Sequence, residues 1–225
     1  MGKIVNTEFV EVLKLKDVME KIIKIAISLF MENGFKATTT RQIISEANIR
    51  NGTLYHYFQN KDDILKYILV DAFDEITKRA EQLLCEEGNL VMHFSLRISL
   101  TLKIVDKDPR IADLYTEAYR SWLIMERLLP ILIEQSEKSF QEYSPQLTKE
   151  EHYIRSLAIL GCMYGFIAEG HYNKHINFEK KVSVLLDMIL SSFSVEKKAR
   201  ESFIERSLFI LSGMNDDEIA LFPEK

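Results

Sequence analysis

The chain has 225 residues, of which 47% are apolar and 28% are charged, and its formal net charge is −5. This length and apolar content suffice to bury one large core, or a small domain beside a larger one, and they exclude an intrinsically disordered chain. Its apolar runs are far shorter than the roughly 20 residues that cross a bilayer, and its first residues lack the apolar core of a signal peptide. We therefore expect a globular, cytoplasmic protein.

Positive and negative charges are distributed unevenly along the chain. Residues 1–66 hold ten Lys and Arg against eight Asp and Glu, whereas residues 67–225 hold nineteen against twenty-six. A basic N-terminal part on an acidic remainder is typical of a nucleic-acid-binding module joined to a separate core. Cys85 and Cys162 have neither CxxC spacing nor histidine partners nearby in sequence. We expect two buried thiols, without a zinc site or a disulfide framework, and no cofactor is indicated.

Helical periodicity runs through almost the whole chain without sustained strand alternation, which predicts an all-α fold. Only four prolines and eight glycines interrupt it. The first sixteen residues form an amphipathic extension. The first clear helix is predicted to begin at Asp17, which can form a capping pair with Glu20, and to end at Asn33-Gly34.

Two short helices follow the first one. Thr39 and Gln42 predict a capping box at the start of a helix of about two turns. Asn48 then tolerates the left-handed backbone that a tight turn requires, and residues 51–58 form the next helix. This arrangement is a helix-turn-helix unit, whose second helix fits a major groove about 12 Å wide.

The remaining helices are longer and less polar. Capping signals start three of them, at Asn60, Asp108 and Thr148. Pro109 is placed favourably in the first turn of the second, whereas Pro130 is expected to kink or end a helix. A break at 172–177 separates the last pair of long helices, and one further helix is expected between 196 and 225.

Side chains on the outer face of the helix at 51–58 supply the groups that read or hold DNA. Asn51 can pair with an adenine edge, Thr53 can contact a thymine methyl or a phosphate, and Tyr55 and His56 can donate to phosphates. Gly52 has no side chain to obstruct the duplex. The start of the preceding helix can also meet a phosphate. The candidate DNA contacts are Thr39, Thr40, Arg41, Arg50, Asn51, Gly52, Thr53, Tyr55, His56 and Lys61.

Four stretches follow one another at a specific spacing: Gly34-Phe35, Thr38-Thr39-Thr40-Arg41-Gln42-Ile43, Gly52-Thr53-Leu54-Tyr55-His56-Tyr57-Phe58 and Asn60-Lys61-Asp62-Asp63-Ile64-Leu65. Their order resembles the DNA-binding region of the TetR family of bacterial transcriptional repressors. The resemblance implies a three-helix helix-turn-helix domain over residues 1–63 and a larger helical ligand-binding and dimerisation domain over residues 64–225. It also implies a homodimeric, ligand-responsive repressor that binds a palindromic operator in double-stranded DNA.

Two positions depart from the family pattern. Asn48 stands where many members have glycine, and Arg50-Asn51 stand where they have Ser-Lys. We expect Arg50 and Asn51 to make contacts that differ from those of the Ser-Lys pair, with one of the two still reaching DNA.

Two patterns in the C-terminal part concern a dimer and a ligand. Small or apolar residues recur at helical spacing in the last two long helices, as they would at a dimer interface or in ordinary intramolecular packing; they are Ala158, Gly161, Cys162, Gly165, Val182, Leu185, Ile189 and Phe193. Bulky side chains with a few polar groups could line a cavity for an apolar or aromatic effector, or could be core; the candidates are His93, Glu117, Tyr119, Trp122, Met163 and Phe166.

Two other functions are open. The same fold could activate transcription, or organise DNA, without any small-molecule signal. An all-α enzyme is the weaker alternative, because the sequence has no Ser/His/Asp order, HExxH motif, phosphate-binding loop or paired-carboxylate motif. Among the histidines, His152 and His171 have no acidic residue three or four positions away in the sequence. We therefore predict a transcriptional regulator and no enzyme.

Overall fold

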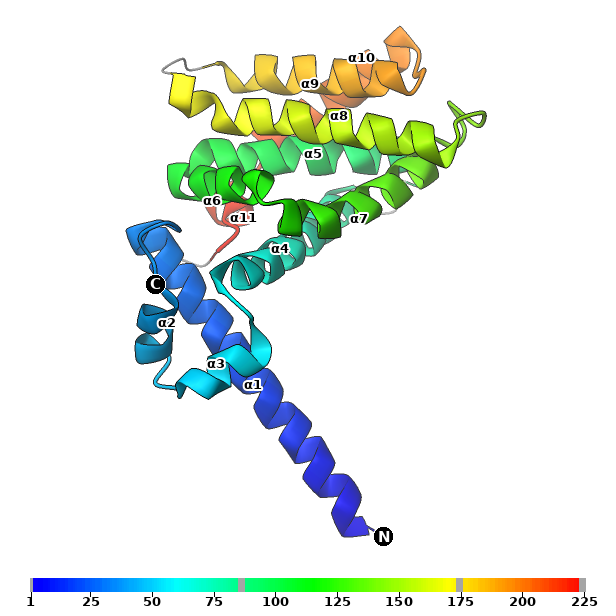
Figure 1. Cartoon of the computed structure of the whole chain (residues 1–225). Coiled ribbons are helices and arrows are strands. Elements are labelled where there is room, and N and C mark those ends of the chain that lie inside the picture. The colour runs from blue at the N-terminus through cyan, green and yellow to red at the C-terminus, as the bar shows by residue number, and fades with distance from the viewer. Residues whose placement is uncertain (1, 85–87, 173–175, 223–225) are drawn as a thin grey trace. The chain divides into compact units, whose positions relative to one another are not determined.

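A computed structural model describes residues 2–84, 88–172 and 176–222, with side-chain positions from residue 16 onward except at 171 and 172. Every regular element within these ranges is helical, as the periodicity predicted (Figure 1). The chain divides into two compact units, Met1–Ile68 and Leu69–Lys225. Their boundary and the expected one after residue 63 both fall within helix α4, Lys61–Leu83. Cys85 and His175, and the side chain of His171, lie outside the described residues.

The N-terminal unit contains α1 (Gly2–Asn33), α2 (Thr40–Glu46), α3 (Asn51–Tyr57) and the first turns of α4. The predicted start of the first helix at Asp17 is wrong, because α1 already begins at Gly2. No proline or glycine occurs between residues 3 and 33, so a capping signal inside this stretch does not stop a helix that can continue past it. The predicted end is confirmed: Gly34 follows with φ +80, the left-handed conformation that favours glycine after a helix.

A small apolar core holds the helices of the N-terminal unit together. Phe30 of α1 is 1% exposed, and its ring meets the ring of Phe35 edge to face at a centroid distance of 5.1 Å. Ile43 of α2 and Leu54 of α3 are fully buried. Phe58, which follows α3, is also buried. The inward faces of these two short helices are therefore fixed.

The C-terminal unit is built around one central helix. It contains α5 (Leu90–Lys107), α6 (Pro109–Arg120), α7 (Trp122–Phe140), α8 (Lys149–Ile167), the 3₁₀ helix η1 (Ala168–Tyr172), α9 (Phe178–Ser192), α10 (Lys197–Ser212) and α11 (Asp216–Ile219). α5 contacts α6, α7, α8, α9 and α10 (Figure 1). Almost every residue of α5 between Val91 and Val105 is buried. None of the described helices is long and apolar enough to cross a membrane.

Local signals set most helix boundaries of the C-terminal unit. The side chain of Asp108 accepts a hydrogen bond from the backbone of Arg110, and Pro109 is the first residue of α6. Thr148 forms the predicted capping box at the start of α8. Pro130 does not end a helix, because α7 continues through it to Phe140. A proline inside a helix costs about 3 kcal/mol, because a backbone hydrogen bond is lost and the ring clashes with the preceding turn. Burial of Leu132 and Phe140 beyond the proline offsets this cost. The tail adds α10, as predicted, and the short α11.

A buried ion cluster joins α9 to α5 and η1. Lys181 of α9 is 3% exposed. Its ammonium lies 2.7 Å from a carboxylate oxygen of Asp106 and 2.6 Å from one of Glu169. Because Lys181, Asp106 and Glu169 lie on three different elements, one cation holds three segments together.

Candidate DNA-binding surface and ligand cavity

The start of α2 is fixed by two sets of side-chain hydrogen bonds. The backbone N–H of Thr39 donates to the side-chain oxygen of Gln42 at 2.7 Å, and the N–H of Gln42 donates to the Thr39 hydroxyl oxygen at 3.3 Å. The buried Thr38 hydroxyl donates to the carbonyls of Leu29 and Gly34 at 3.0 and 2.9 Å. The capping box satisfies the N–H groups at the helix start, and Thr38 ties that start to the end of α1.

A tight turn then directs α3. Asn48 has φ 49, the left-handed conformation predicted for it. The N–H of Ile49 donates to the carbonyl of Ile44 at 3.2 Å, which closes the turn. Arg50 occupies the N-cap position of α3 and makes no side-chain capping bond. Its side chain is exposed and is therefore not held at the helix end.

The outer face of α3 carries polar groups and a glycine. Leu54 is fully buried, whereas Tyr55 is 54% exposed and Asn51 and His56 are exposed. A Cβ added at Gly52 would meet nothing within 4 Å. The packing of the unit itself therefore does not require glycine at this position.

The ten residues expected to contact DNA lie at the start of α2, along α3 and its N-cap, and at the start of α4. Seven are exposed and three are half-buried. The exposed ones are Thr39, Arg41, Arg50, Asn51, Gly52, Tyr55 and His56, and the half-buried ones are Thr40, Thr53 and Lys61.

Lys61 is engaged within the N-terminal unit. Its ammonium donates to the carbonyls of Phe35 and Thr38, the latter at 2.7 Å, and lies 4.3 Å from the centre of the Phe35 ring. The side chain thus closes the segment between α1 and α2. Sequence reasoning missed this role because the partners lie 23 to 26 residues away along the chain.

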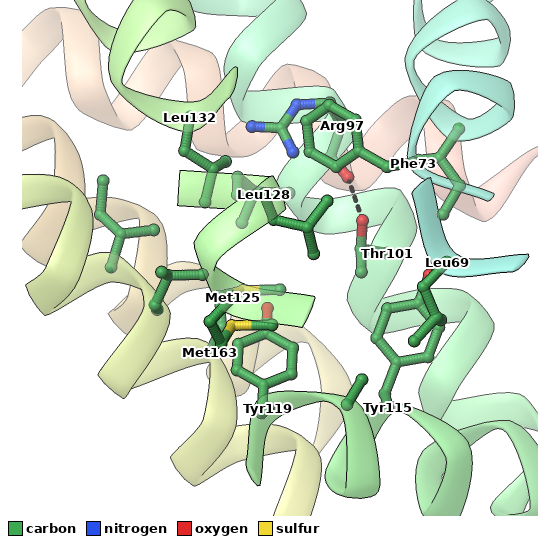
Figure 2. A pocket seen from close by; sticks show the side chains of 15 residues that line it. Leu69, Phe73, Arg97, Thr101, Tyr115, Tyr119, Met125, Leu128, Leu132 and Met163 are labelled. Carbon is green, nitrogen blue, oxygen red and sulfur yellow. Dashed lines mark hydrogen bonds between the residues drawn. The ribbon is translucent and has the colours of Figure 1, made fainter. Parts of the chain in front are cut away.

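A cavity lies inside the C-terminal unit between α4, α5, α6, α7 and α8. It is lined by Leu69, Phe73, Ile76, Arg97, Ile98, Thr101, Tyr115, Ala118, Tyr119, Met125, Leu128, Leu132, Ile159, Leu160 and Met163 (Figure 2). The space that the centre of a water molecule can reach is about 40 Å³, room for about three waters or a small organic group. Most of the lining side chains are apolar, as in most small-molecule sites.

Two of the six predicted pocket residues line this cavity, namely Tyr119 and Met163. The other four, His93, Glu117, Trp122 and Phe166, do not. Trp122 is the first residue of α7 and is 74% exposed. Periodicity identifies bulky residues of a helix but does not identify which of its faces meets a cavity.

Sequence reasoning did not single out Arg97, the one charged residue of the lining. Arg97 is 4% exposed, and its guanidinium carbon lies 4.6 Å from the ring centre of Phe73 and 5.2 Å from that of Phe94. Burial lowers the pKa of Arg97 to about 10, so the group stays charged at neutral pH. Burial raises the pKa values of Tyr115 and Tyr119 above their usual range, so both hydroxyls stay protonated. A lone arginine in the apolar run Phe94-Ser95-Leu96-Arg97-Ile98 was the available signal.

The structure separates the two halves of the predicted dimer interface. On α8, Ala158, Gly161 and Gly165 are exposed and Cys162 is half-buried. On α9 and at its C-cap, Val182, Leu185, Ile189 and Phe193 are at most 3% exposed within one chain. These four side chains therefore belong to the core of the C-terminal unit, whereas the α8 residues lie at its surface.

A Ser–His pair in the C-terminal unit is structural. The Ser136 hydroxyl lies 2.9 Å from Nδ1 of His152, and the imidazole stacks on the Phe193 ring at 5.7 Å. Both residues are buried, so a substrate has no access to the pair. Within the described ranges, no group of three or more His, Cys, Asp or Glu side chains could hold a metal ion.

The N-terminal unit is similar in sequence to known regulatory proteins. Residues 22–68 match the family model described as bacterial regulatory proteins, tetR family. The transcriptional repressor KstR2 of Mycolicibacterium smegmatis is 35% identical over 65 residues, which cover 29% of this chain and 32% of that protein. The transcriptional regulator QacR of Staphylococcus aureus is 31% identical over 120 residues, 52% of this chain and 62% of that protein. The chain thus matches less than two thirds of the length of either relative.

The fold of the whole chain is similar to that of solved regulators. The crystal structure of RolR in complex with resorcinol aligns with a TM-score of 0.65 and 18% sequence identity, covering 87% of this chain and 96% of that one. An N-terminal helix-turn-helix unit and a helical C-terminal unit are thus common to both folds. With the family match over residues 22–68, these likenesses identify the N-terminal unit as that of the tetR family of bacterial regulatory proteins.

Proposed function

We propose that the protein is a homodimeric, ligand-responsive transcriptional repressor that binds a pseudo-palindromic operator. The observation that carries this proposal is the capped α2, the left-handed turn at Asn48 and the exposed polar face of α3. This arrangement suits insertion of α3 into a major groove. KstR2 is named a repressor and QacR a regulator, which supports the same role here. A protein that regulates bacterial genes acts in the cytoplasm, and we propose no catalytic activity.

Direct reading of bases would fall to the start of α3. Asn51 is exposed and can form the paired hydrogen bonds that select adenine. Tyr55 and His56 would contact phosphates, together with Arg41 at the start of α2. The open space around Gly52 supports a close approach of the duplex. Lys61 would act by positioning the segment between α1 and α2.

The dimer would form through an exposed apolar surface on α8 and α9, which contact each other. We call this surface the dimer face. Its exposed residues are Ile154, Leu157, Ala158, Gly161 and Gly165 of α8, and Val184 and Met188 of α9. Large apolar residues there flank small ones, so two helix axes could approach closely. A twofold dimer presents two copies of α3, which matches two half-sites about one helical turn apart.

The effector would bind in the cavity of the C-terminal unit. Ligand binding changes DNA affinity only if the ligand favours one conformation over the other. The cavity is lined by α4, the helix in which the boundary between the two units falls, so a ligand there could act on the spacing of the two DNA-binding units. RolR, whose fold is similar, was solved with resorcinol. An apolar or aromatic effector therefore suits this chain.

Selection of bound duplexes from a randomised DNA pool at about 0.1 M salt tests the proposal, because affinities depend on ionic strength. We expect enrichment of a palindromic motif and a stoichiometry of two chains per motif. A set of operators with half-sites moved apart by 2 to 6 base pairs should then lose binding. One chain per site, with no effect of half-site spacing, would contradict the dimer model. Binding that vanishes with salt and enriches no motif would contradict operator recognition.

A further inference from the structure

The cavity contains a buried cation without an anionic partner. Arg97 is 4% exposed, and no described Asp or Glu forms an ion pair with it. One terminal nitrogen of its guanidinium, Nη2, is buried without a hydrogen-bond partner among the described residues. The contacts of the guanidinium are the faces of Phe73 and Phe94. Ring faces attract a cation, but they accept none of its N–H hydrogen bonds.

The buried hydroxyl groups of α5, in contrast, have partners within the helix. The hydroxyls of Ser95, Ser99 and Thr101 each donate to the backbone carbonyl four residues earlier, at 2.8 to 2.9 Å. Thr101 even uses the carbonyl of Arg97 itself, as Figure 2 shows. The short polar residues of this helix are therefore satisfied within it. A buried charge without a counter-charge is unfavourable, which points to a partner from outside the chain.

The surroundings of Arg97 restrict the chemistry of that partner. Arg97 is the one charged residue among those that line the cavity. Tyr115 and Tyr119, from α6, add hydroxyls close enough to affect the pKa of the guanidinium. Both hydroxyls stay protonated, so they can donate hydrogen bonds to an anion. One cation and two neutral donors suit a single negative charge, whereas a phosphate dianion would lack a second cation.

The rest of the cavity lining restricts the chemistry of the ligand beyond its anionic group. Leu69, Leu128 and Leu132 are among the apolar side chains that surround the space (Figure 2). Met125 and Met163 also line it, and unbranched methionine side chains rearrange readily around ligands of different shape. A tail larger than the present volume can therefore be admitted by movement of these side chains.

We propose that the effector is an organic monocarboxylate with an apolar or aromatic tail, whose carboxylate pairs with Arg97. The proposal rests on the ligand-responsive function proposed above and names its ligand class. The planar guanidinium binds a carboxylate through two parallel N–H···O bonds. The tail lies among the leucine and methionine side chains, and the hydroxyls of Tyr115 and Tyr119 donate to the carboxylate or to a polar group beside it.

Matched acids and amides test the role of the charge. The full-length protein is titrated calorimetrically with the straight-chain carboxylates from butanoate to hexadecanoate and with 3-phenylpropanoate, and in parallel with the primary amide of each. We expect the best acid to bind at least about tenfold more tightly than its amide, which has the same shape without the charge. The Arg97→Met variant should bind that acid about 10- to 100-fold more weakly and its amide unchanged.

Two control variants separate binding from folding. Arg127→Met removes an exposed arginine of α7 that does not line the cavity, so it should leave acid binding unchanged. The ligand-free Arg97→Met protein should melt no lower than the parent, because it loses an unpaired buried charge. If it melts lower, Arg97 has a structural role and the proposal is overturned. Arg97→Lys keeps the charge without the paired geometry, and should still prefer the acid, with weaker affinity.

The outcomes distinguish this inference from the proposed function. If acid and amide bind equally and Arg97→Met weakens both or neither, the anionic effector is refuted while ligand binding stands. If no acid of the series binds, while the protein still binds its selected operator, the monocarboxylate proposal fails and operator recognition stands. If no operator is found but the acid binds through Arg97, the proposed repressor function fails and the assignment of the cavity holds.

Discussion

Removing the ammonium of Lys181 should destabilise the C-terminal unit strongly. Lys181 bridges Asp106 and Glu169 at 2.7 and 2.6 Å. In the Lys181→Met variant the methylene chain still packs, but two carboxylates face each other without a cation. One oxygen of Glu169 already has no hydrogen-bond partner among the described residues, so this acid depends on the lysine.

The structure sets the magnitude of this effect. Breaking a buried ion pair by removing one partner costs about 3–5 kcal/mol. The side chains of Asp106 and Glu169 are 23% and 12% exposed, so water can screen the remaining charges in part, and we expect the lower end, about 3 kcal/mol. For a unit of this size each kcal/mol lowers Tm by about 2–4 °C, which gives a fall of about 6–12 °C.

Circular dichroism melts and urea titrations of the full-length protein measure this change. Lys138→Met is the matched control, because Lys138 pairs with Glu134 at 2.7 Å with both side chains more than 60% exposed, and solvent screens such a pair so strongly that it adds little stability. A triple variant, Lys181→Met with Asp106→Asn and Glu169→Gln, should recover most of the loss, because no charge is left unpaired. Equal shifts for the Lys181 and Lys138 variants would refute the reasoning.

Three further predictions concern DNA reading, pH and assembly. Tyr55→Ala should weaken binding to all DNA sequences, whereas Asn51→Ala should relax base preference at one position at a cost of about 1–3 kcal/mol. Competition titrations with single-base variants of the operator measure both effects. Unchanged DNA affinity in both variants would mean that α3 does not read DNA. Burial lowers the pKa of His152, so the unfolded chain binds its proton more tightly. The contribution of His152 to the free energy of unfolding should be fully present above the unfolded pKa of about 6.5 and should be lost as pH drops below it. Urea midpoints at pH 7.5 and 5.5 measure this loss, and His152→Phe should reduce it. An identical fall of the midpoint in that variant would contradict the assignment to His152. An added side chain at Gly161 meets nothing within one chain, so Gly161→Arg should leave Tm of the protomer unchanged and give a monomer in sedimentation, with Gly161→Ala as control. A dimeric arginine variant would exclude the dimer face.

Local sequence determined most helix boundaries and the turn between α2 and α3. Capping boxes join residues three apart, as Thr39 with Gln42, and the left-handed turn needs only the residue type at Asn48. Both depend on neighbours along the chain, so the sequence predicts them without knowledge of the fold. The start of α1 shows the limit, because a capping signal at Asp17 stops a helix only when the residues before it cannot continue that helix.

Tertiary structure decided which helix faces are inside and which distant charges meet. Periodicity placed residues of α8 and α9 on common faces, but whether a face packs within the chain or against a second copy depends on the helices beside it; the α9 seam is buried and the α8 stripe is exposed. Lys61 and Lys181 have partners 12 to 75 residues away, which no local pattern specifies. The cavity around Arg97 likewise exists only because five helices leave a space between them, since packing is a property of the assembled chain and not of any one segment.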